Sequence, residues 1–386
     1  TVSVALTSDN YVQAFLIKSG ISSFGIGMYG FFMQIFAMIA YFFLLGISPK
    51  KKGFKRKYLW SSMLLCAFPI GLILSNSIGS QKIATLLIAT VAGVIFSVFL
   101  AYKNTCEYSM VSYIFEKEYY GVVLGKGGVL GGLLAFAITG FSSRLLGKLG
   151  FPMGYYFIFL VAALIFIVSA LFIINLKLHL PNHEEFIEKG PSINSLLRTM
   201  LTKEYLMRLF PHFLRGMGSS GIYFFMTIAM SCIDLTENQI AVAVAIGVAS
   251  ITVSNLLFVF AIKYISVSRI VWSTNLVCGI CMVVTTLNSN LYVFYILYGM
   301  LMFFYTLSQL SIPTGVLHST KTEDMPAISA MRMLLTSAAS SLFILLYGSL
   351  LKIIPAIYIM LFAATIFIIC GYCYKKQFET ASNSNF

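Results

Sequence analysis

A few ionisable side chains interrupt the long apolar stretches of this sequence. Two are acids and four are bases: Asp9, Glu107, Lys103, Lys126, Arg215 and Arg332. A charged side chain inside a bilayer is costly, so each of these residues is by default a candidate for a functional site. A carboxylate in such a place can carry a proton or bind a cation, and Arg can hold a carboxylate or phosphate with two hydrogen bonds.

Three of these residues fall on either side of one short turn. Lys103 and Glu107 are four residues apart, so they share one face of a helix. Lys126 follows on the next apolar stretch, and we expect it to face Glu107, with Asn104 close by. Removing one partner of such a pair would leave a buried charge uncompensated.

Asp9 stands in a polar segment near the start of the chain. Asn10, Tyr11 and Gln13 follow it within a short apolar frame. The functional interpretation is a proton or cation site, and the structural alternative is a buried ion pair or a helix-packing residue.

Arg215 and Arg332 lie in the second half of the sequence, in helices without an acid at comparable depth. Each could pair with Asp9 or Glu107, capture an anionic solute, close a gate near loop acids, or serve packing alone. The remaining uncharged candidates for a cavity wall are polar residues of several spans, some of which would instead make hydrogen bonds between helices: Gln34, Ser219, Ser220, Tyr223, Asn255 and Gln309.

The apolar stretches themselves predict the fold class. The composition is 59% hydrophobic and 10% charged, with a mean hydropathy of +0.89, whereas an ordinary soluble domain carries about 25% charged residues. Each stretch is long enough for a membrane helix, which needs roughly 20 residues, and too long for a barrel strand. The expected spans are 24–46, 58–76, 83–114, 121–145, 153–176, 206–232, 239–262, 269–287, 291–317, 327–351 and 353–374, preceded by a partial one at 1–17.

The sequence begins without Met, and we expect it to start inside its first helix. The native chain would then be longer by roughly one to two dozen residues.

The net charge of +13 is unevenly distributed. Most of the Lys and Arg residues fall in alternate loops and at the C-terminal end, as the positive-inside rule requires of cytoplasmic segments. The excess of basic residues therefore determines the membrane topology, and we identify no basic patch for binding nucleic acid. Both termini are expected in the cytoplasm.

The organisation of the spans resembles the major facilitator superfamily. A polar stretch at 177–204 separates two sets of six spans, and a basic loop joins the second and third. That loop carries Gly46 and Gly53 seven residues apart, followed by Lys55 and Arg56, as in the superfamily's gating loop; the usual acid is replaced by Lys50. The resemblance implies an all-α membrane protein of twelve helices, with a six-helix bundle at 1–176, a cytoplasmic linker at 177–204, a second bundle at 205–376 and a tail at 377–386.

We therefore expect a secondary active transporter of a small polar solute, working by alternating access with proton coupling in a bacterial plasma (inner) membrane. The excess of bases over acids favours a solute with an anionic group. Sodium coupling, a neutral sugar or peptide, a non-transporting receptor and an intramembrane transferase remain alternatives. No phosphate-binding loop, metal-ligand cluster or catalytic triad is found in the sequence, so neither an enzyme nor a cofactor is expected. The expected partners are the solute, protons and membrane lipids; we expect no nucleic acid and a monomer.

Overall fold

The structure is a computed structural model of the chain. It describes residues 6–44, 54–78, 82–114, 117–174, 202–233, 235–319 and 325–383. Within these ranges every regular element is helical. The expected linker at 177–204, except for its last residues, and the loop segment from Gly46 to Gly53 lie outside the described residues.

The first group of helices covers the first part of the chain. Its members are α2 (Asp9–Lys18), α3 (Ser23–Leu44), α4 (Phe54–Leu64), α5 (Ala67–Ile78), α6 (Lys82–Ile114), α7 (Lys117–Leu149) and α8 (Met153–Ile174). The second group consists of α10 (Lys203–Tyr223), α11 (Phe225–Ile233), α12 (Glu237–Tyr264), α13 (Val267–Thr286), α14 (Leu291–Ser319), α15 (Met325–Leu350) and α16 (Ala356–Asn383).

These helices form twelve successive segments, as expected from the sequence. Ten are long and apolar enough to cross a membrane. The other two are α2, which has 10 described residues, and the pair α10 and α11, which is interrupted at Phe224. The all-α, twelve-helix fold class is confirmed. The chain is an integral, multi-pass membrane protein.

The third segment is bent where α4 meets α5. Proline at position 69 cannot donate a backbone hydrogen bond, and its ring clashes with the carbonyl group four residues earlier, at Leu65. At this point Cys66 and Phe68 instead donate to the carbonyl groups three residues before them, at Met63 and Leu65. The bend therefore has a local cause in the sequence.

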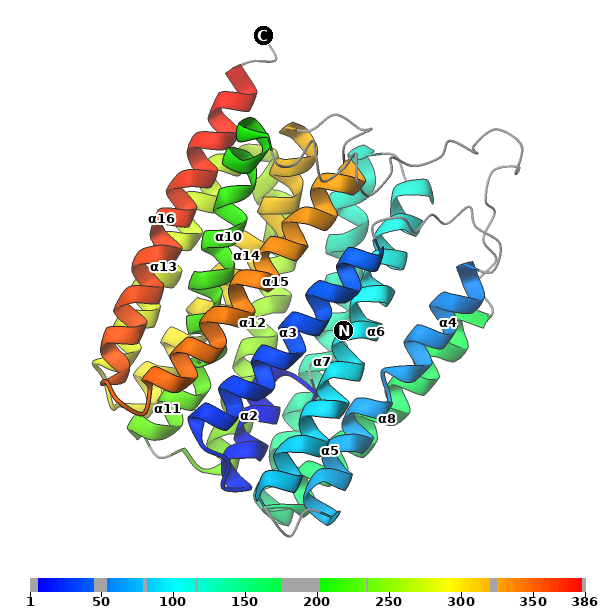
Figure 1. Cartoon of the computed structure of the whole chain (residues 1–386), viewed down its shortest axis with the longest axis vertical. Helices are drawn as coiled ribbons and strands as arrows, with labels where there is room; N and C mark the ends of the chain where they lie inside the picture. Colours follow the sequence, from blue (N-terminus) through cyan, green and yellow to red (C-terminus); the bar gives the residue numbers. More distant parts are fainter. Residues whose placement is uncertain are drawn as a thin grey trace.

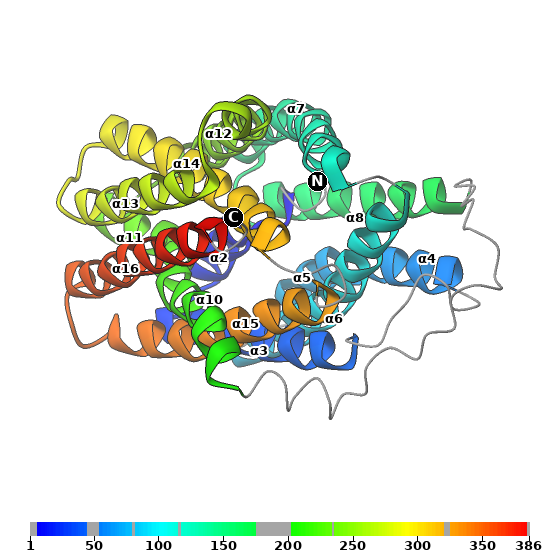
Figure 2. The same cartoon turned by 90° about the horizontal axis from the view of Figure 1, so that it is seen from above.

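Two seams join the groups (Figure 1). α3 packs along α15, and α7 packs along α12. Seen from above, these seams lie on opposite sides of the molecule, and α2 lies between the groups, where it contacts α11 and α12 (Figure 2). The first group therefore contributes its shortest described segment to the centre of the protein.

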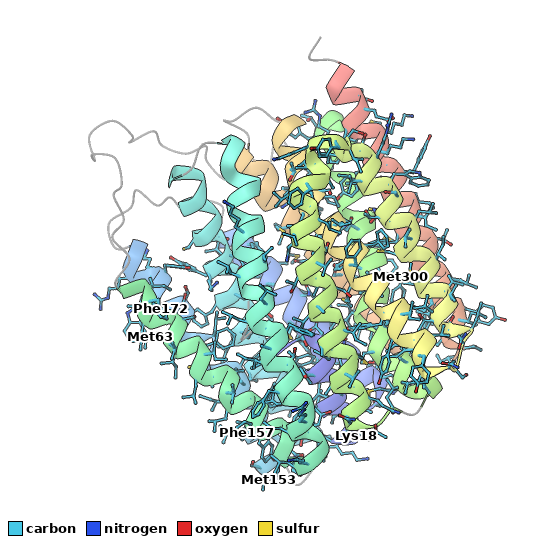
Figure 3. The ribbon with its side chains drawn as sticks, turned by 180° about the vertical axis from the view of Figure 1, so that it is seen from behind. Lys18, Met63, Met153, Phe157, Phe172 and Met300 are labelled. Atoms are coloured by element: carbon cyan, nitrogen blue, oxygen red, sulfur yellow. The ribbon has the colours of Figure 1, made fainter. Side chains whose placement is uncertain are left out.

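The two ends of the molecule differ in their number of basic residues, which is higher at the end that carries Arg56, Lys57, Lys203, Lys263 and Arg269. We call the end at which α3, α8 and α14 finish and α4 and α10 begin the basic face; it is uppermost in Figure 1. The other end, the opposite face, holds Lys18 and Met153, at the end of α2 and the start of α8 (Figure 3). Large apolar side chains cover the outer surface between the faces, among them Phe43 and Phe172 at 74% and 72% exposure. Such a surface suits contact with lipid chains.

Candidate functional site: a polar cluster between the two helix groups

Three hydrogen bonds fasten α2 to the second group of helices. The Asn10 side-chain amide donates to the Tyr298 hydroxyl on α14, 2.5 Å away. The Gln13 amide donates to the carbonyl oxygen of Tyr223 at 2.7 Å, and the hydroxyl of Thr227 donates to the Gln13 carbonyl at 2.7 Å. Since Gln13 is fully buried, both halves of its amide need such partners.

Asp9 lies beside this hydrogen-bonded cluster. It is four residues before Gln13 and therefore on the same face of α2. It lies near Tyr29, Tyr223 and Tyr298, which come from both groups of helices. The side chain is nevertheless solvent-accessible. Asp9 therefore borders an accessible space between the groups, and no described cation forms an ion pair with it.

Two tyrosine hydroxyls close to this cluster have no hydrogen-bond partner. Tyr11 and Tyr29 are almost completely buried, and neither hydroxyl group is paired within the described structure. An unpaired buried hydroxyl costs about 1–3 kcal/mol. A solute, a water molecule or another conformation of the protein can supply the missing partner.

An aromatic wall continues the cluster on the side of the second group. The rings of Phe225, Phe294 and Tyr298 stack on one another with centroids 5.8–6.0 Å apart. Phe225 starts α11 directly after the interruption at Phe224, so the break in this segment sets the position of the wall. The sequence predicted no role for it.

Close backbone contacts seal the first seam near the opposite face. A side-chain carbon at Gly348 of α15 would lie only 2.9 Å from the Cα atom of Gly27 on α3. One turn further along α3, a carbon at Gly30 would lie 2.8 Å from the hydroxyl of Tyr223. At the end of this seam the Lys352 ammonium lies 4.6 Å from the centre of the Phe24 ring. Helices α3 and α15 are therefore closed against each other at this end.

The second seam is closed from the opposite face to its middle. Gly147 of α7 lies against Asn238 of α12, and a side-chain carbon at Gly132 would clash with the hydroxyl of Thr252. Gly128 lies against Asn255. At the neighbouring Gly127 an added carbon would meet nothing within 4 Å, and Lys126 is exposed.

Arg215 lies outside this cluster, within the second group of helices. It is 4% exposed, donates to the Ser308 hydroxyl at 2.9 Å, and lies over the rings of Tyr305 and Phe367. Ser308 in turn donates to Asn275. Arg215 makes no ion pair with Asp9 in the described structure, so the pairing considered from the sequence is absent in this conformation.

Arg332 lies on α15, one turn before Thr336, and is half-buried. Thr336 donates to the backbone of both Arg332 and His212, and the His212 ring lies 2.5 Å from the Tyr374 hydroxyl. These contacts again belong to the second group.

The cluster at Lys103 lies far along α6 from Asp9. At about 1.5 Å per residue, Lys103 is about 31 Å from the start of α6 at Lys82, which is close to the full thickness of a bilayer core. Lys103 and Asn104 are half-buried there, and Glu107 is on the following turn, with its side chain outside the described structure. These residues lie toward the basic face, as does Lys126 on α7.

The remaining predicted residues are dispersed. Gln34 is half-buried on α3, and Gln309 is exposed on α14, where it donates to the Tyr305 hydroxyl at 2.6 Å. Of the gating loop, Lys55 and Arg56 fall in the first turn of α4, and Arg56 is exposed.

Sequence reasoning missed Tyr29, Tyr298 and Thr227. Tyrosine is frequent in this chain, with 22 residues, so none of these positions differs from an ordinary packing residue in the sequence. The hydrogen bonds with α2 distinguish Tyr298 and Thr227, and the unpaired buried hydroxyl distinguishes Tyr29.

Two groups of membrane helices meet along two seams, with polar side chains between them. The chain therefore has the fold of the major facilitator superfamily.

Solved structures support this assignment. The nucleoside transporter NupG superimposes with a TM-score of 0.67 at 16% sequence identity, over 96% of this chain and 94% of that one. The fucose:proton symporter FucP of E. coli superimposes with a TM-score of 0.63 at 12% identity, over 97% and 96% of the two chains. No protein-family model and no curated protein matches the sequence.

Proposed function

We propose that this protein is a secondary active transporter that moves a small polar solute across a bacterial inner membrane, driven by protons. The basic face is the cytoplasmic side by this proposal, as the positive-inside rule requires, and both termini of the native protein are in the cytoplasm. The protein acts as a monomer. It is a transporter by this proposal, and the receptor and transferase alternatives predict no solute flux.

The observation that carries the proposal is the place of Asp9. Asp9 is exposed, and it lies between the two groups of helices near tyrosines from both groups. A proton that binds there changes the charge at the point where the groups meet. Binding at this point can favour one arrangement of the groups over the other, which is the requirement for coupling.

The contacts that close the opposite face support an assignment of the protein's conformational state. Gly27 against Gly348 and Phe24 beside Lys352 close that face, while Lys126 and Gly127 border open space toward the basic face. We infer that this is the state open to the cytoplasm. Alternating access then requires the seam contacts to separate while the two bundles, 1–176 and 205–376, move as units about the linker at 177–204.

The chemistry of the cluster favours a neutral, hydroxyl-bearing solute. Asp9 and Asn10, the partly accessible members of the cluster, offer acceptors and donors for a solute's hydroxyl groups. The hydroxyls of Tyr11 and Tyr29 are buried and unpaired in this conformation, so they would meet a solute only after the helices separate. A sugar or a nucleoside carries such hydroxyl groups, and the two similar structures are named for solutes of these kinds.

An anionic solute is the second candidate. From the sequence, Arg215 was a possible binding residue for such a solute. In the structure it is enclosed by Ser308, Tyr305 and Phe367, which weakens the case for an anionic solute. Lys126 remains exposed toward the basic face and is the base that such a solute would meet first. In the gating loop, Gly46, Gly53, Lys55 and Arg56 would then act on opening of the basic face.

Uptake into liposomes tests the proposal. Purified protein is reconstituted, an inward proton gradient is imposed, and labelled sugars, nucleosides and organic acids are supplied one at a time. Accumulation that a protonophore abolishes is the expected result. Accumulation driven by a sodium gradient instead would identify sodium as the coupling ion. If none of these solutes were transported, the proposal would be contradicted.

A further inference from the structure

A lateral cavity lies in the first group of helices, away from Asp9. It has a volume of about 600 Å³ and is lined by residues of α3, α4 and α6. This volume is within the range of roughly 300–1,000 Å³ that is usual for small-ligand sites. In the ribbon views α6 lies between α3 and α4 (Figures 1 and 2), and residues of all three helices line the cavity.

The walls of the cavity are apolar and open outward. Phe43 is 74% exposed, Trp60 is 53% exposed, and Phe36 and Ile39 are each 39% exposed. Helix α4 packs on α6 and α8 of its own group. The cavity is therefore a groove on the outer surface of the first group, at a depth where the surrounding medium is lipid.

The chemistry of the groove changes at its end toward the basic face. Lys57, in the second turn of α4, is exposed and lines the groove, and Arg56 beside it is also exposed. The polar group of Ser61, one turn deeper, already donates to the backbone of Tyr58 at 2.8 Å and needs no ligand. The groove thus combines an apolar body with a cationic end at the membrane surface.

We propose that this groove is a binding site for an anionic phospholipid. An acyl chain occupies the space between α3 and α4, and the phosphate-bearing headgroup lies against Lys57. Charge complementarity decides between lipids, because Lys57 attracts a headgroup with net negative charge and gives no advantage to a zwitterionic one. Trp60 is at the level where the ring of an interfacial tryptophan meets the headgroup region.

The position of Trp60 provides a direct measurement. The chain has only two tryptophans, Trp60 and Trp272, so Trp272→Phe leaves the fluorescence of Trp60 alone. This variant is reconstituted in phosphatidylcholine with a small fraction of phosphatidylglycerol or phosphatidylcholine brominated on the acyl chains. Bromine quenches a tryptophan that it touches. We expect half-quenching at a roughly fivefold lower mole fraction of the anionic lipid, the ratio expected from one basic residue at the surface.

Three variants test the parts of the site. Lys57→Gln should remove the preference for the anionic lipid, whereas Lys148→Gln, an exposed residue at the opposite face, should retain it. Ala40→Phe fills the groove and should weaken quenching by both lipids. Val91→Phe on the exposed surface of α6 is its control, since Val91 is 59% exposed and outside the groove.

The converse variant, Trp60→Phe, reports general enrichment of anionic lipid. Trp272 also lies near the basic face, one turn after the exposed Arg269, but it is outside the groove. Its quenching therefore measures general enrichment of the anionic lipid, which Lys57→Gln should leave unchanged. Equal quenching of Trp60 by the two lipids, or a preference that survives Lys57→Gln, would overturn the proposal. Should Ala40→Phe fail to fold, the Lys57→Gln comparison still decides. No transport measurement enters, so the result is independent of the proposed solute.

Discussion

The side-chain amide of Asn10 donates to the hydroxyl of Tyr298, which is 288 positions later in the chain. This bond joins the first and second groups of helices at the centre of the protein. Gln13, one turn along α2, makes the equivalent connection to α10 and α11. If the protein works by the alternating access proposed above, these bonds would break when the opposite face opens, and they would then contribute to the balance between states.

Removal of the Tyr298 hydroxyl should shift this balance. A hydrogen bond of this kind contributes about 1 kcal/mol, which corresponds to roughly a fivefold change in an equilibrium between two states. We expect Tyr298→Phe to raise the apparent solute affinity measured from the opposite face relative to that from the basic face. Oriented vesicles of the two polarities provide the measurement. Tyr292→Phe, on the same helix but 75% exposed, is the control; an unchanged affinity ratio in Tyr298→Phe would count against the gating role.

Neutralisation of Asp9 should separate coupling from binding. If Asp9 carries the driving proton, Asp9→Asn removes the difference between its charged and neutral forms. We expect loss of gradient-driven accumulation, with exchange of labelled for unlabelled solute largely intact, because exchange needs no net proton release. Glu379→Gln changes an exposed acid on α16 and should leave both rates unaltered. Continued accumulation by Asp9→Asn would make Asp9 a structural residue and Glu107 the favoured carrier.

A bulky side chain at Gly348 should prevent closure of the opposite face. Its first carbon would lie 2.9 Å from the Cα of Gly27, which is backbone and cannot rotate away. We expect Gly348→Leu to lose net transport while it still binds solute presented at the opposite face, as measured by equilibrium binding to oriented vesicles. Gly140→Leu places the same side chain where nothing lies within 4 Å and should transport normally. Normal transport by Gly348→Leu would show that α3 and α15 can separate enough to accommodate the larger side chain.

Loss of the Ser308 hydroxyl should destabilise the second group of helices. Arg215 is buried and depends on Ser308 for a hydrogen bond to its charge, a contribution of about 1.5–3 kcal/mol. We expect Ser308→Ala to lower the thermal unfolding temperature in detergent. Ser273→Ala, at an exposed serine that bonds only to its own helix, is the control. Equal unfolding temperatures for the two variants would indicate that Arg215 finds another partner.

The sequence by itself determined the number, positions and type of the membrane segments. Burial of a backbone in lipid requires a helix of fixed minimum length, so apolar length alone predicts each span. The same rule explains why predicted boundaries such as 24–46 for α3 and 291–317 for α14 differ from the observed ones by only a few residues. The last helix is the exception, because α16 continues to Asn383, beyond the predicted end at 374 and into the expected tail. Asp9, Asn10 and Gln13 were also recognisable, because polar residues are rare in such a frame.

Tertiary structure alone decided which of the intramembrane residues lie together. Arg215 and Asp9 are equally exceptional in the sequence, yet one is enclosed by the rings of Tyr305 and Phe367 and the other borders the space between the groups. The direction of a side chain depends on the rotation and tilt of its helix. The rotation and tilt of each helix are set by contacts such as Gly27 against Gly348, between residues hundreds of positions apart. The periodicity of apolar residues within one helix cannot predict such contacts.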